Sequence, residues 1–190
     1  AYPILSGLVG SEMCIRDRFC GSNSGNNANY ENATDAIGRE IAARGIKLIY
    51  GGGGLGLMGT LIAAAREVGC ETLGILPEFL TTNQPPIGAL GDHILVDDIF
   101  ERKSLMLENS DCFAVLPGGI GTYDEFFEIL AWKQLGQARQ NIGLLNIDNF
   151  FDPLIMLLDQ GVAEGFIHRA LRQSVIVEVL PQNLLNKLID

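Results

Sequence analysis

Basic residues are scarce in this sequence. Of its 190 residues, 13 are Lys or Arg and 23 are Asp or Glu, which gives a net charge of −10 and a pI near 4.6. Nucleic acids and anionic membranes are bound by clustered cations, so this composition argues against both as partners. A single phosphate group needs only a few local donors and is compatible with it.

The sequence is also poor in metal-binding patterns. Its four cysteines stand far apart without a CxxC pair, and its two histidines have no metal-ligand spacing. These residues are Cys14, Cys20, Cys70, Cys112, His93 and His168. We therefore expect reduced thiols in a cytoplasmic protein, with no structural zinc and no Ser-His-Asp triad.

Long apolar runs are absent as well. No run approaches the roughly 18 to 20 residues that span a bilayer, and no basic segment opens the chain. We expect a soluble protein without a membrane partner. With 47% apolar and 19% charged residues in a chain of 190, the composition predicts one globular domain with a substantial core.

The first 18 residues lack the pattern of an opening strand. A strand that is buried on both faces of a parallel sheet is rich in Val and Ile, yet Arg16, Asp17 and Arg18 stand directly before Phe19. We hypothesise that residues 1–18 are foreign to the domain, either non-native or disordered. The domain itself is then expected to span residues 19–190.

From residue 19 onward, short apolar runs alternate with helical segments that often end at glycine. This alternation predicts an α/β domain with an open parallel sheet and helices on both faces. The expected strands lie at 46–50, 71–76, 93–96, 112–116, 141–147 and 175–179. The expected helices span 29–44, 98–108 and 154–160, and others begin after the glycines at 51–54, at 122 and at 181.

The stretch 116–125, LPGGIGTYDE, is predicted to hold the end of a strand, a glycine turn and the start of a helix. Its glycines let the backbone approach a ligand closely, and the free N–H groups of a helix N-terminus attract an anion. Thr122 and Glu125 have the spacing of a capping box, with Thr122 as the N-cap. The stretch therefore predicts an anion site.

A second glycine-rich turn covers residues 51–59. Gly54, Gly56 and Gly59 match the dinucleotide fingerprint, but they follow the second expected strand, whereas the fingerprint belongs to the first. The turn also lacks the Gly-Lys-Ser/Thr ending of a P-loop. NAD, purely structural glycines and another phosphate-bearing ligand are the three interpretations. Two glycine turns at the carboxyl ends of parallel strands favour the last.

Two cations of the helix expected at 98–108 face the same way as its apolar residues. At 100° per residue, Lys103 falls inside the apolar sector and Arg102 at its margin. In one interpretation these side chains extend toward water or pair with a carboxylate. In the other they form a cationic wall for an anionic substrate.

The turn at 21–25, GSNSG, is similar in outline to a nucleophile elbow. Its central position is Asn23 instead of Ser, so it cannot supply that nucleophile. We expect a tight turn after the first strand, with Ser22 available to a ligand.

Five motifs together resemble the LONELY GUY family, cytokinin riboside 5′-monophosphate phosphoribohydrolases long mislabelled as lysine decarboxylases. They are FCGS at 19–22, YGGG with GLMG at 50–59, ERK at 101–103, LPGGIGTYDE at 116–125 and WKQLG at 132–136. The resemblance covers about residues 19–180. It implies a Rossmann-like fold, a homodimer, and cleavage of the N-glycosidic bond of a nucleoside 5′-monophosphate to free base and ribose 5-phosphate.

By motif position, the resemblance implies that Arg102 and Glu125 are the catalytic pair. The residues expected to bind the substrate are Ser22, Gly52, Gly53, Met58, Lys103, Gly118, Gly119, Ile120, Gly121 and Thr122. The sequence departs from the family's pattern in its first strand and at Ala131, where many members have Thr. These departures concern the Ser22 end of the pocket and the contacts to the base.

In the expected mechanism the phosphate binds at 118–122, while Glu125 stabilises an oxocarbenium-like state and activates water. Arg102 fixes the ribose or phosphate and keeps Glu125 ionised, and no metal or organic cofactor is needed. One alternative is a nucleotide-binding module without catalysis, in which Glu125 is only a capping residue. Another is a pyridoxal-phosphate decarboxylase, for which Lys103 alone among the four lysines is suitably placed.

Overall fold

Strands that all run in one direction form a single sheet at the centre of the molecule. The computed structural model describes residues 14–82 and 93–190, and within them the sheet has seven strands in the order β4-β3-β2-β1-β5-β6-β7. The strands are β1 (Cys14–Phe19), β2 (Lys47–Tyr50), β3 (Thr72–Pro77), β4 (His93–Val96), β5 (Cys112–Val115), β6 (Asn141–Leu145) and β7 (Val175–Glu178). The predicted parallel α/β sheet is confirmed.

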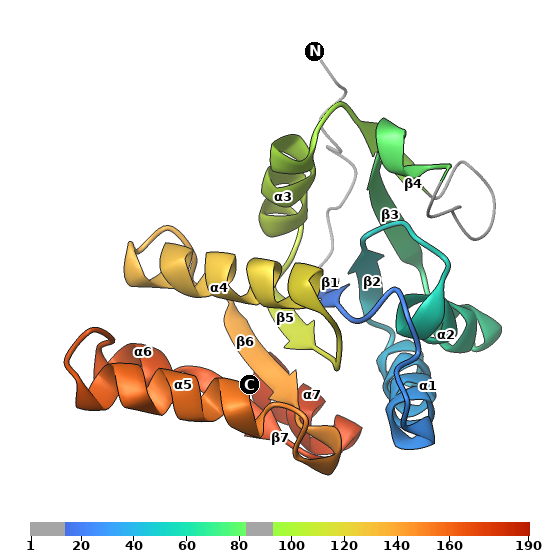
Figure 1. Ribbon diagram of the computed structural model, residues 1–190. Coiled ribbons are helices and arrows are strands. Elements are labelled where there is room, and N and C mark those ends of the chain that lie inside the picture. The colour runs from blue at the N-terminus through green and yellow to red at the C-terminus, as the bar shows by residue number, and fades with distance from the viewer. Residues whose placement is uncertain (1–13, 83–92) are drawn as a thin grey trace.

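Helices cover both faces of this sheet, as predicted (Figure 1). They are α1 (Ala28–Ala43), α2 (Gly56–Glu67), α3 (Ile99–Glu108), α4 (Ile120–Gln134), α5 (Asp152–Ala163), α6 (Arg169–Gln173) and α7 (Pro181–Ile189), with short turns η1 (Glu78–Leu80) and η3 (Ile147–Asn149). The apolar sides of α1, α2 and α7 share one core cluster, those of α4 and α5 a second, and α3 packs in a third. The short helix α6 was not predicted from the sequence.

The direction of chain travel across the sheet reverses between β1 and β5. From β1 the chain moves outward through β2 and β3 to β4, and it then returns to β5 beside β1 before moving outward to β7. Figure 1 shows this as blue β1 in the middle, green strands toward one edge and orange to red strands toward the other. Ligands of open parallel sheets collect at such a reversal, beyond the carboxyl ends of the strands.

Strand β1 is the central strand by its backbone pairing. It pairs with β2 on one side and β5 on the other, with a register shift against β5 between Asp17 and Phe19. Of the segment predicted to be foreign, residues 1–13 lie outside the described residues, and residues 14–18 form most of β1. The hypothesis that residues 1–18 are not native to the domain stays a prediction.

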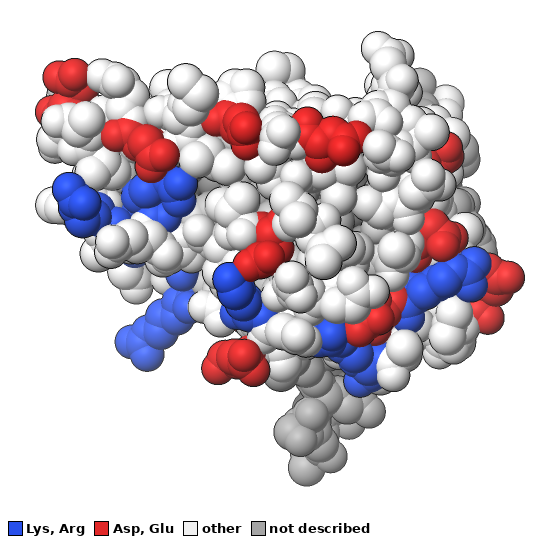
Figure 2. Space-filling model, turned by 90° about the horizontal axis from the view of Figure 1, so that it is seen from below, with Lys and Arg blue, Asp and Glu red and all other residues white. Residues whose placement is uncertain are grey.

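One face of the molecule carries charges of both signs. Figure 2 shows acidic and basic side chains interspersed over the face seen from below. Such a distribution differs from the clustered cations that bind phosphate polymers. Among the residues described, no helix combines the length and hydropathy that a membrane span requires.

Candidate functional site

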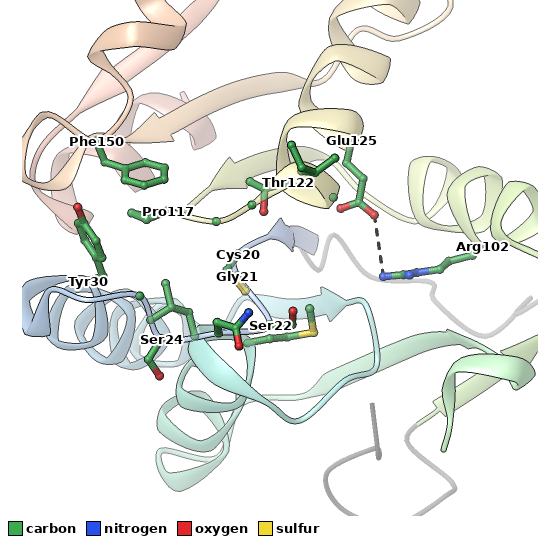
Figure 3. A pocket seen from close by; sticks show the side chains of 18 residues that line it. Cys20, Gly21, Ser22, Ser24, Tyr30, Arg102, Pro117, Thr122, Glu125 and Phe150 are labelled. Atoms are coloured by element: carbon green, nitrogen blue, oxygen red, sulfur yellow. Dashed lines mark ion pairs between the residues drawn. The ribbon is translucent and has the colours of Figure 1, made fainter. Parts of the chain in front are cut away.

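A cavity of about 480 Å³ lies at the carboxyl ends of β1 and β5 (Figure 3). The loop after β1 forms one wall, and the loop after β5 with the first turns of α4 forms another. The described residues that line it are residues 20–25, Tyr30, Leu57, Met58, Arg102, residues 117–122, Glu125 and Phe150. The cavity therefore stands at the reversal point of the sheet.

Most of the residues predicted from the sequence meet in this cavity. Those that line it are Ser22, Met58, Arg102, Gly118, Gly119, Ile120, Gly121, Thr122 and Glu125. Three predicted residues are not among the lining residues, namely Gly52, Gly53 and Lys103. The two glycine turns thus contribute unequally. Every residue of the turn at 117–122 lines the cavity, whereas the turn at 51–59 contributes only Leu57 and Met58.

The turn after β5 is packed so closely that only glycine fits at its start. A Cβ on Gly118 would lie 2.0 Å from Thr122 Oγ1 and 2.9 Å from the backbone nitrogen of Gly21. The backbone nitrogen of Gly21 donates a hydrogen bond to the carbonyl of Pro117 at 3.0 Å. The loops after β1 and β5 are therefore held against each other, and both present backbone to the cavity.

Helix α4 begins earlier than the sequence predicted. Gly119 is its N-cap and Ile120 its first residue, and the backbone nitrogen of Tyr123 donates to the carbonyl of Gly119 at 3.1 Å. The predicted capping box is wrong, because Thr122 and Glu125 lie within the helix and Gly119 has no side chain to cap it. The free N–H groups at the start of α4 consequently come from the glycine turn, beside the cavity.

The turn at 51–59 supports the loop after β1. A Cβ on Gly56, whose φ is +59°, would lie 2.4 Å from the backbone nitrogen of Asn23. The backbone nitrogen of Met58 donates to the carbonyl of Gly21 at 3.3 Å. This packing gives the second glycine of the dinucleotide-like fingerprint a structural role, and it fixes the loop that carries Ser22.

Arg102 of α3 and Glu125 of α4 form a buried ion pair on the β2 side of the cavity. Arg102 Nη2 lies 3.9 Å from Glu125 Oε1, and the two residues are 6% and 8% exposed. A Cβ on Gly51, which follows β2, would lie 2.2 Å from Arg102 Nη2, so glycine makes room for the guanidinium. Figure 3 shows both side chains directed toward each other from separate helices.

The environment of Arg102 favours a further polar partner. Burial lowers the pKa of Arg102, and the charge of Glu125 opposes this shift. Its Nε is buried and has no hydrogen-bond partner within the described part of the chain. A buried donor without a partner costs about 1–3 kcal/mol, so an anionic or hydroxylated ligand that accepts from Arg102 would be stabilised.

Lys103 faces inward as predicted, but away from the cavity lining. Its Nζ lies 3.0 Å from an oxygen of Asp124 and 3.1 Å from one of Glu128, both on α4. Burial opposes protonation, yet hydrogen bonds and charges of these two carboxylates outweigh it and raise the pKa of Lys103. Lys103 therefore joins α3 to α4 and matches the interpretation in which an inward cation pairs with carboxylates.

Two aromatic residues of the cavity were not recognised as site residues from the sequence. Tyr30 lies on α1 and Phe150 follows η3, and their rings meet edge to face with centroids 5.4 Å apart. Periodicity assigned Tyr30 to the apolar face of its helix, with no sign that this face reaches a ligand site. The one available signal for Phe150 was its place just after the strand 141–145, on the edge where ligands bind.

The fold and the cavity define a Rossmann-like α/β protein with a ligand site at the reversal point of its sheet. Residues 58–188 match the family model described as "Possible lysine decarboxylase". A relative from Oryza sativa subsp. japonica, named as a probable cytokinin riboside 5′-monophosphate phosphoribohydrolase, is 42% identical over 176 residues, which cover 93% of this chain and 78% of the relative. A cytokinin riboside 5′-monophosphate phosphoribohydrolase from Arabidopsis thaliana is 39% identical over 176 residues, 93% and 76% of the two chains. The chain belongs to this family, the LONELY GUY phosphoribohydrolases, and the resemblance seen in the motifs is confirmed.

Solved structures share the fold at lower identity. A molybdenum cofactor binding protein from Rippkaea orientalis superposes with a TM-score of 0.66 at 22% identity, covering 94% of this chain and 98% of that one. DNA processing protein A from Helicobacter pylori gives a TM-score of 0.56 at 15% identity, covering 93% and 80%. These likenesses confirm the Rossmann-like fold.

The lysines of the chain do not fit the decarboxylase description. A pyridoxal-phosphate enzyme needs a lysine amine in its site to form a Schiff base. None of the four lysines is among the described lining residues of the cavity. Each contacts an oxygen elsewhere: Lys47 pairs with Glu71, Lys103 with Asp124 and Glu128, Lys187 with Glu178, and Lys133 donates to the carbonyl of Gln140.

Proposed function

We propose that this protein hydrolyses the N-glycosidic bond of a nucleoside 5′-monophosphate, releasing the free base and ribose 5-phosphate. The observation that carries the proposal is the buried Arg102–Glu125 pair, which shares one cavity with the glycine-rich start of α4. The names of the relatives at 39–42% identity support the same reaction class. The preferred base is proposed to be adenine or an N-substituted adenine of the cytokinin type.

The phosphate is proposed to bind at residues 118–122. The first N–H groups of α4 have no partner inside the helix, and the helix dipole adds partial positive charge at this end. Thr122 lines the same wall, and its hydroxyl is a further donor. Because Gly118 excludes a side chain, an anion can approach the backbone closely.

Glu125 is proposed to act on the ribose, one helical turn beyond the phosphate. The C1′–N bond breaks with its electron pair passing to the base, which leaves an oxocarbenium-like ribose that a nearby carboxylate stabilises. A water molecule then bonds to C1′ and gives one proton to Glu125, which passes it to the departing base, so that the base leaves neutral and Glu125 is ionised again. Arg102 accepts no proton in this scheme, since its guanidinium stays charged, and it holds ribose hydroxyls or phosphate oxygens in place.

The base is proposed to lie on the β2 side of the cavity, beyond the ribose. Leu57 and Met58 line the cavity from α2 and offer apolar surface to a planar base. A Cβ on Gly51 would lie 3.6 Å from Met58 Cε and 2.2 Å from Arg102 Nη2, so the thioether and the guanidinium are close neighbours there. Met58 is flexible and polarizable, which suits contact with bases of differing substitution.

A base-release assay tests this proposal. Purified protein is incubated with AMP, isopentenyl-AMP and the corresponding nucleosides, and free base and ribose 5-phosphate are quantified by chromatography. We expect release from the monophosphates and at least tenfold slower release from the nucleosides. Equal rates on both would contradict the phosphate site. Nucleotide that binds tightly and is recovered intact after long incubation would favour a binding module without catalysis.

We also propose that the protein forms a homodimer through α4 and α5. Apolar side chains stand exposed on this side of the molecule, among them Ile120 at 82%, Phe127 at 38% and Leu157 at 59%. Exposed apolar residues that gather on neighbouring elements often mark a protein contact. Light scattering should give twice the chain mass of 20.6 kDa, and Phe127→Glu should shift the protein toward the monomer. A monomeric wild-type protein would contradict this.

A further inference from the structure

The wall of the cavity opposite the Arg102–Glu125 pair is aromatic. In the sheet, β1 and β5 lie between β2 and β6. The loops that carry Ser22 and Gly118 follow β1 and β5. Arg102 contacts the turn after β2, whereas Phe150 follows β6 and its ring meets that of Tyr30. Figure 3 shows the same arrangement, with Thr122 and Ser22 between the two ends.

Hydrogen bonds hold this aromatic wall in place. One carboxylate oxygen of Asp148 accepts from the side-chain amides of Asn27 at 2.7 Å and Asn29 at 2.8 Å. Asn27 is also the N-cap of α1, which carries Tyr30, and Asp148 stands two residues before Phe150. This clasp therefore ties the segment after β6 to the start of α1, and with it one ring to the other.

The segment between β6 and α5, which carries Phe150, is also held by hydrogen bonds of its own. Asp148 and Asn149 adopt the left-handed conformation, with φ of 48° and 63°. The side chain of Asn146 accepts from the backbone nitrogen of Phe151 at 2.7 Å and donates to Asp152 at 2.8 Å. Phe151 is fully buried. The position of Phe150 is thus determined by bonds on both sides of it.

The aromatic end offers a poor environment for a charged group. Among the described residues that line the cavity, Arg102 is the only cation, and it lies at the other end. Apart from the hydroxyl of Tyr30, these two rings offer no donor that replaces the water a phosphate would lose, so burying a phosphate against them is costly. Hydrogen bonds from Asn29 and Asn27 lower the pKa of Asp148, so its carboxylate keeps a negative charge near the wall.

We infer that Tyr30 and Phe150, held by Asp148, limit the substrate to a single phosphate. The inference rests on the proposed function, in which the phosphate binds at 118–122 and the ribose faces Glu125. A second phosphate attaches opposite the ribose, so it would extend from the start of α4 toward the two rings. There it meets two aromatic rings and no cation of the described lining residues, so nucleoside diphosphates are rejected. Asp148 acts as a positioning residue, because it sets the place of the rings.

The experiment compares AMP and ADP on wild-type protein and on Phe150→Ala. Removing the ring opens the wall, so the ratio of kcat/KM for ADP to that for AMP should rise by about tenfold or more. Asp148→Asn keeps a side chain that tolerates the left-handed backbone but removes the charge, and the ratio should rise several-fold. Phe166→Ala removes a ring of the same size that is 84% exposed and outside the cavity lining, and the ratio should not change.

Binding measurements separate failure of this inference from failure of the proposed reaction. If wild-type protein releases no base from AMP, the proposed reaction is wrong, and titration calorimetry with AMP and ADP still compares the two ligands in the same variants. An ADP-to-AMP ratio that stays within twofold of wild type in folded Phe150→Ala, by kinetics or by binding, overturns the inference. A changed preference among bases in Phe150→Ala overturns it as well, since the rings would then contact the base.

Discussion

At the scale of single residues, the site depends on two buried charges of opposite sign. Arg102 and Glu125 come from different helices, and Arg102 Nη2 lies 3.9 Å from Glu125 Oε1, which is too long for a hydrogen bond between these two atoms. A tighter, bidentate pair would satisfy both groups internally. The longer contact, together with an Arg102 Nε that has no hydrogen-bond partner among the described residues, leaves the guanidinium with donors for a ligand.

Replacing Arg102 by Lys tests whether the planar guanidinium is needed. Lysine keeps the charge but has one donor nitrogen, so it cannot contact Glu125 and a ribose or phosphate oxygen in the same fork. We expect kcat/KM for AMP to fall by at least 100-fold, with circular dichroism unchanged. Retention of more than a third of wild-type activity would show that charge alone suffices.

Local sequence patterns drew attention to Arg102 and Glu125, and the resemblance to the LONELY GUY family implied that they are the catalytic pair. Helix periodicity placed Arg102 and Lys103 on the same side as the apolar residues of their helix, and Glu125 stands shortly after a glycine turn. Tyr30 and Phe150 escaped prediction because their approach depends on the loop after β6 folding back onto α1, a contact across about 120 residues of sequence. Arg102 pairs with Glu125 and Lys103 pairs with Asp124, both on α4. Which carboxylate each cation meets depends on how α3 and α4 pack, so the sequence alone did not predict it.

At the scale of elements, the start of α4 joins the proposed phosphate site to Glu125. The helix begins within the glycine turn, so the backbone that would bind the anion and the turn that carries Glu125 belong to one continuous helix. The sequence predicted a strand, a turn and a helix here, but it placed the helix start two residues late. The capping-box pattern misled the prediction, since Gly119 takes the N-cap position at which Thr122 was expected.

Two alanine substitutions in this turn should have opposite effects on stability. In Gly118→Ala the new Cβ meets Thr122 Oγ1 and the backbone of Gly21, so the free energy of unfolding should fall by about 1–3 kcal/mol. In Gly121→Ala the new Cβ meets no atom within 4 Å outside its chain neighbours and its own helix backbone, and alanine favours the helix, so stability should rise by about 0.5–1 kcal/mol. Urea titrations give both values. Equal effects in the two variants would contradict the packing described.

Lys103 is expected to stabilise the contact between α3 and α4. In Lys103→Gln two carboxylates lose their shared cation, and the free energy of unfolding at pH 7 should fall by roughly 1–2 kcal/mol. Because the folded-state pKa of Lys103 is raised above the unfolded value of about 10.4, its stabilisation is complete below that pH. It is lost as pH rises through the folded-state pKa.

Urea unfolding of wild type and Lys103→Gln at pH 7 and pH 11.5 tests the direction of this pH dependence. The difference between the two proteins should shrink at the higher pH. A difference that grows with pH would mean that Lys103 is stabilised in its neutral form. Lys187→Gln is the matched control, because the Lys187 side chain is 59% exposed and its ion pair with Glu178 should contribute less than 1 kcal/mol.

At the scale of the whole molecule, the strand order explains why distant motifs meet. The motifs at 19–25, 51–59, 101–103 and 116–125 converge because β2, β1 and β5 are neighbours with parallel direction. Alternating strands and helices predicted that architecture, since each crossover helix buries an apolar face. The chain order alone did not determine the strand order, so the arrangement of the motifs around the cavity had to come from the structure.

The central strand gives a prediction for the whole fold. The backbone of β1 lies between β2 and β5, yet the sequence has Arg16, Asp17 and Arg18 there. If residues 1–18 are foreign to the domain, replacing these three by Val should raise the free energy of unfolding by more than about 2 kcal/mol, because central parallel strands are normally apolar. A loss of stability in thermal and urea unfolding would show that the charges belong to the fold.

The central claim, that Glu125 carries out N-glycosidic hydrolysis, is tested most directly by Glu125→Gln. The amide has nearly the same shape but cannot accept the proton of water or stabilise a cation by charge, so kcat for base release from AMP should fall by about 100- to 10,000-fold. AMP should still bind with a Kd within about tenfold of wild type, since the phosphate cradle is intact. Glu31→Gln, which removes an exposed carboxylate of α1 outside the cavity lining, should keep wild-type turnover. Folded Glu125→Gln protein that releases base from AMP at the wild-type rate would contradict the account.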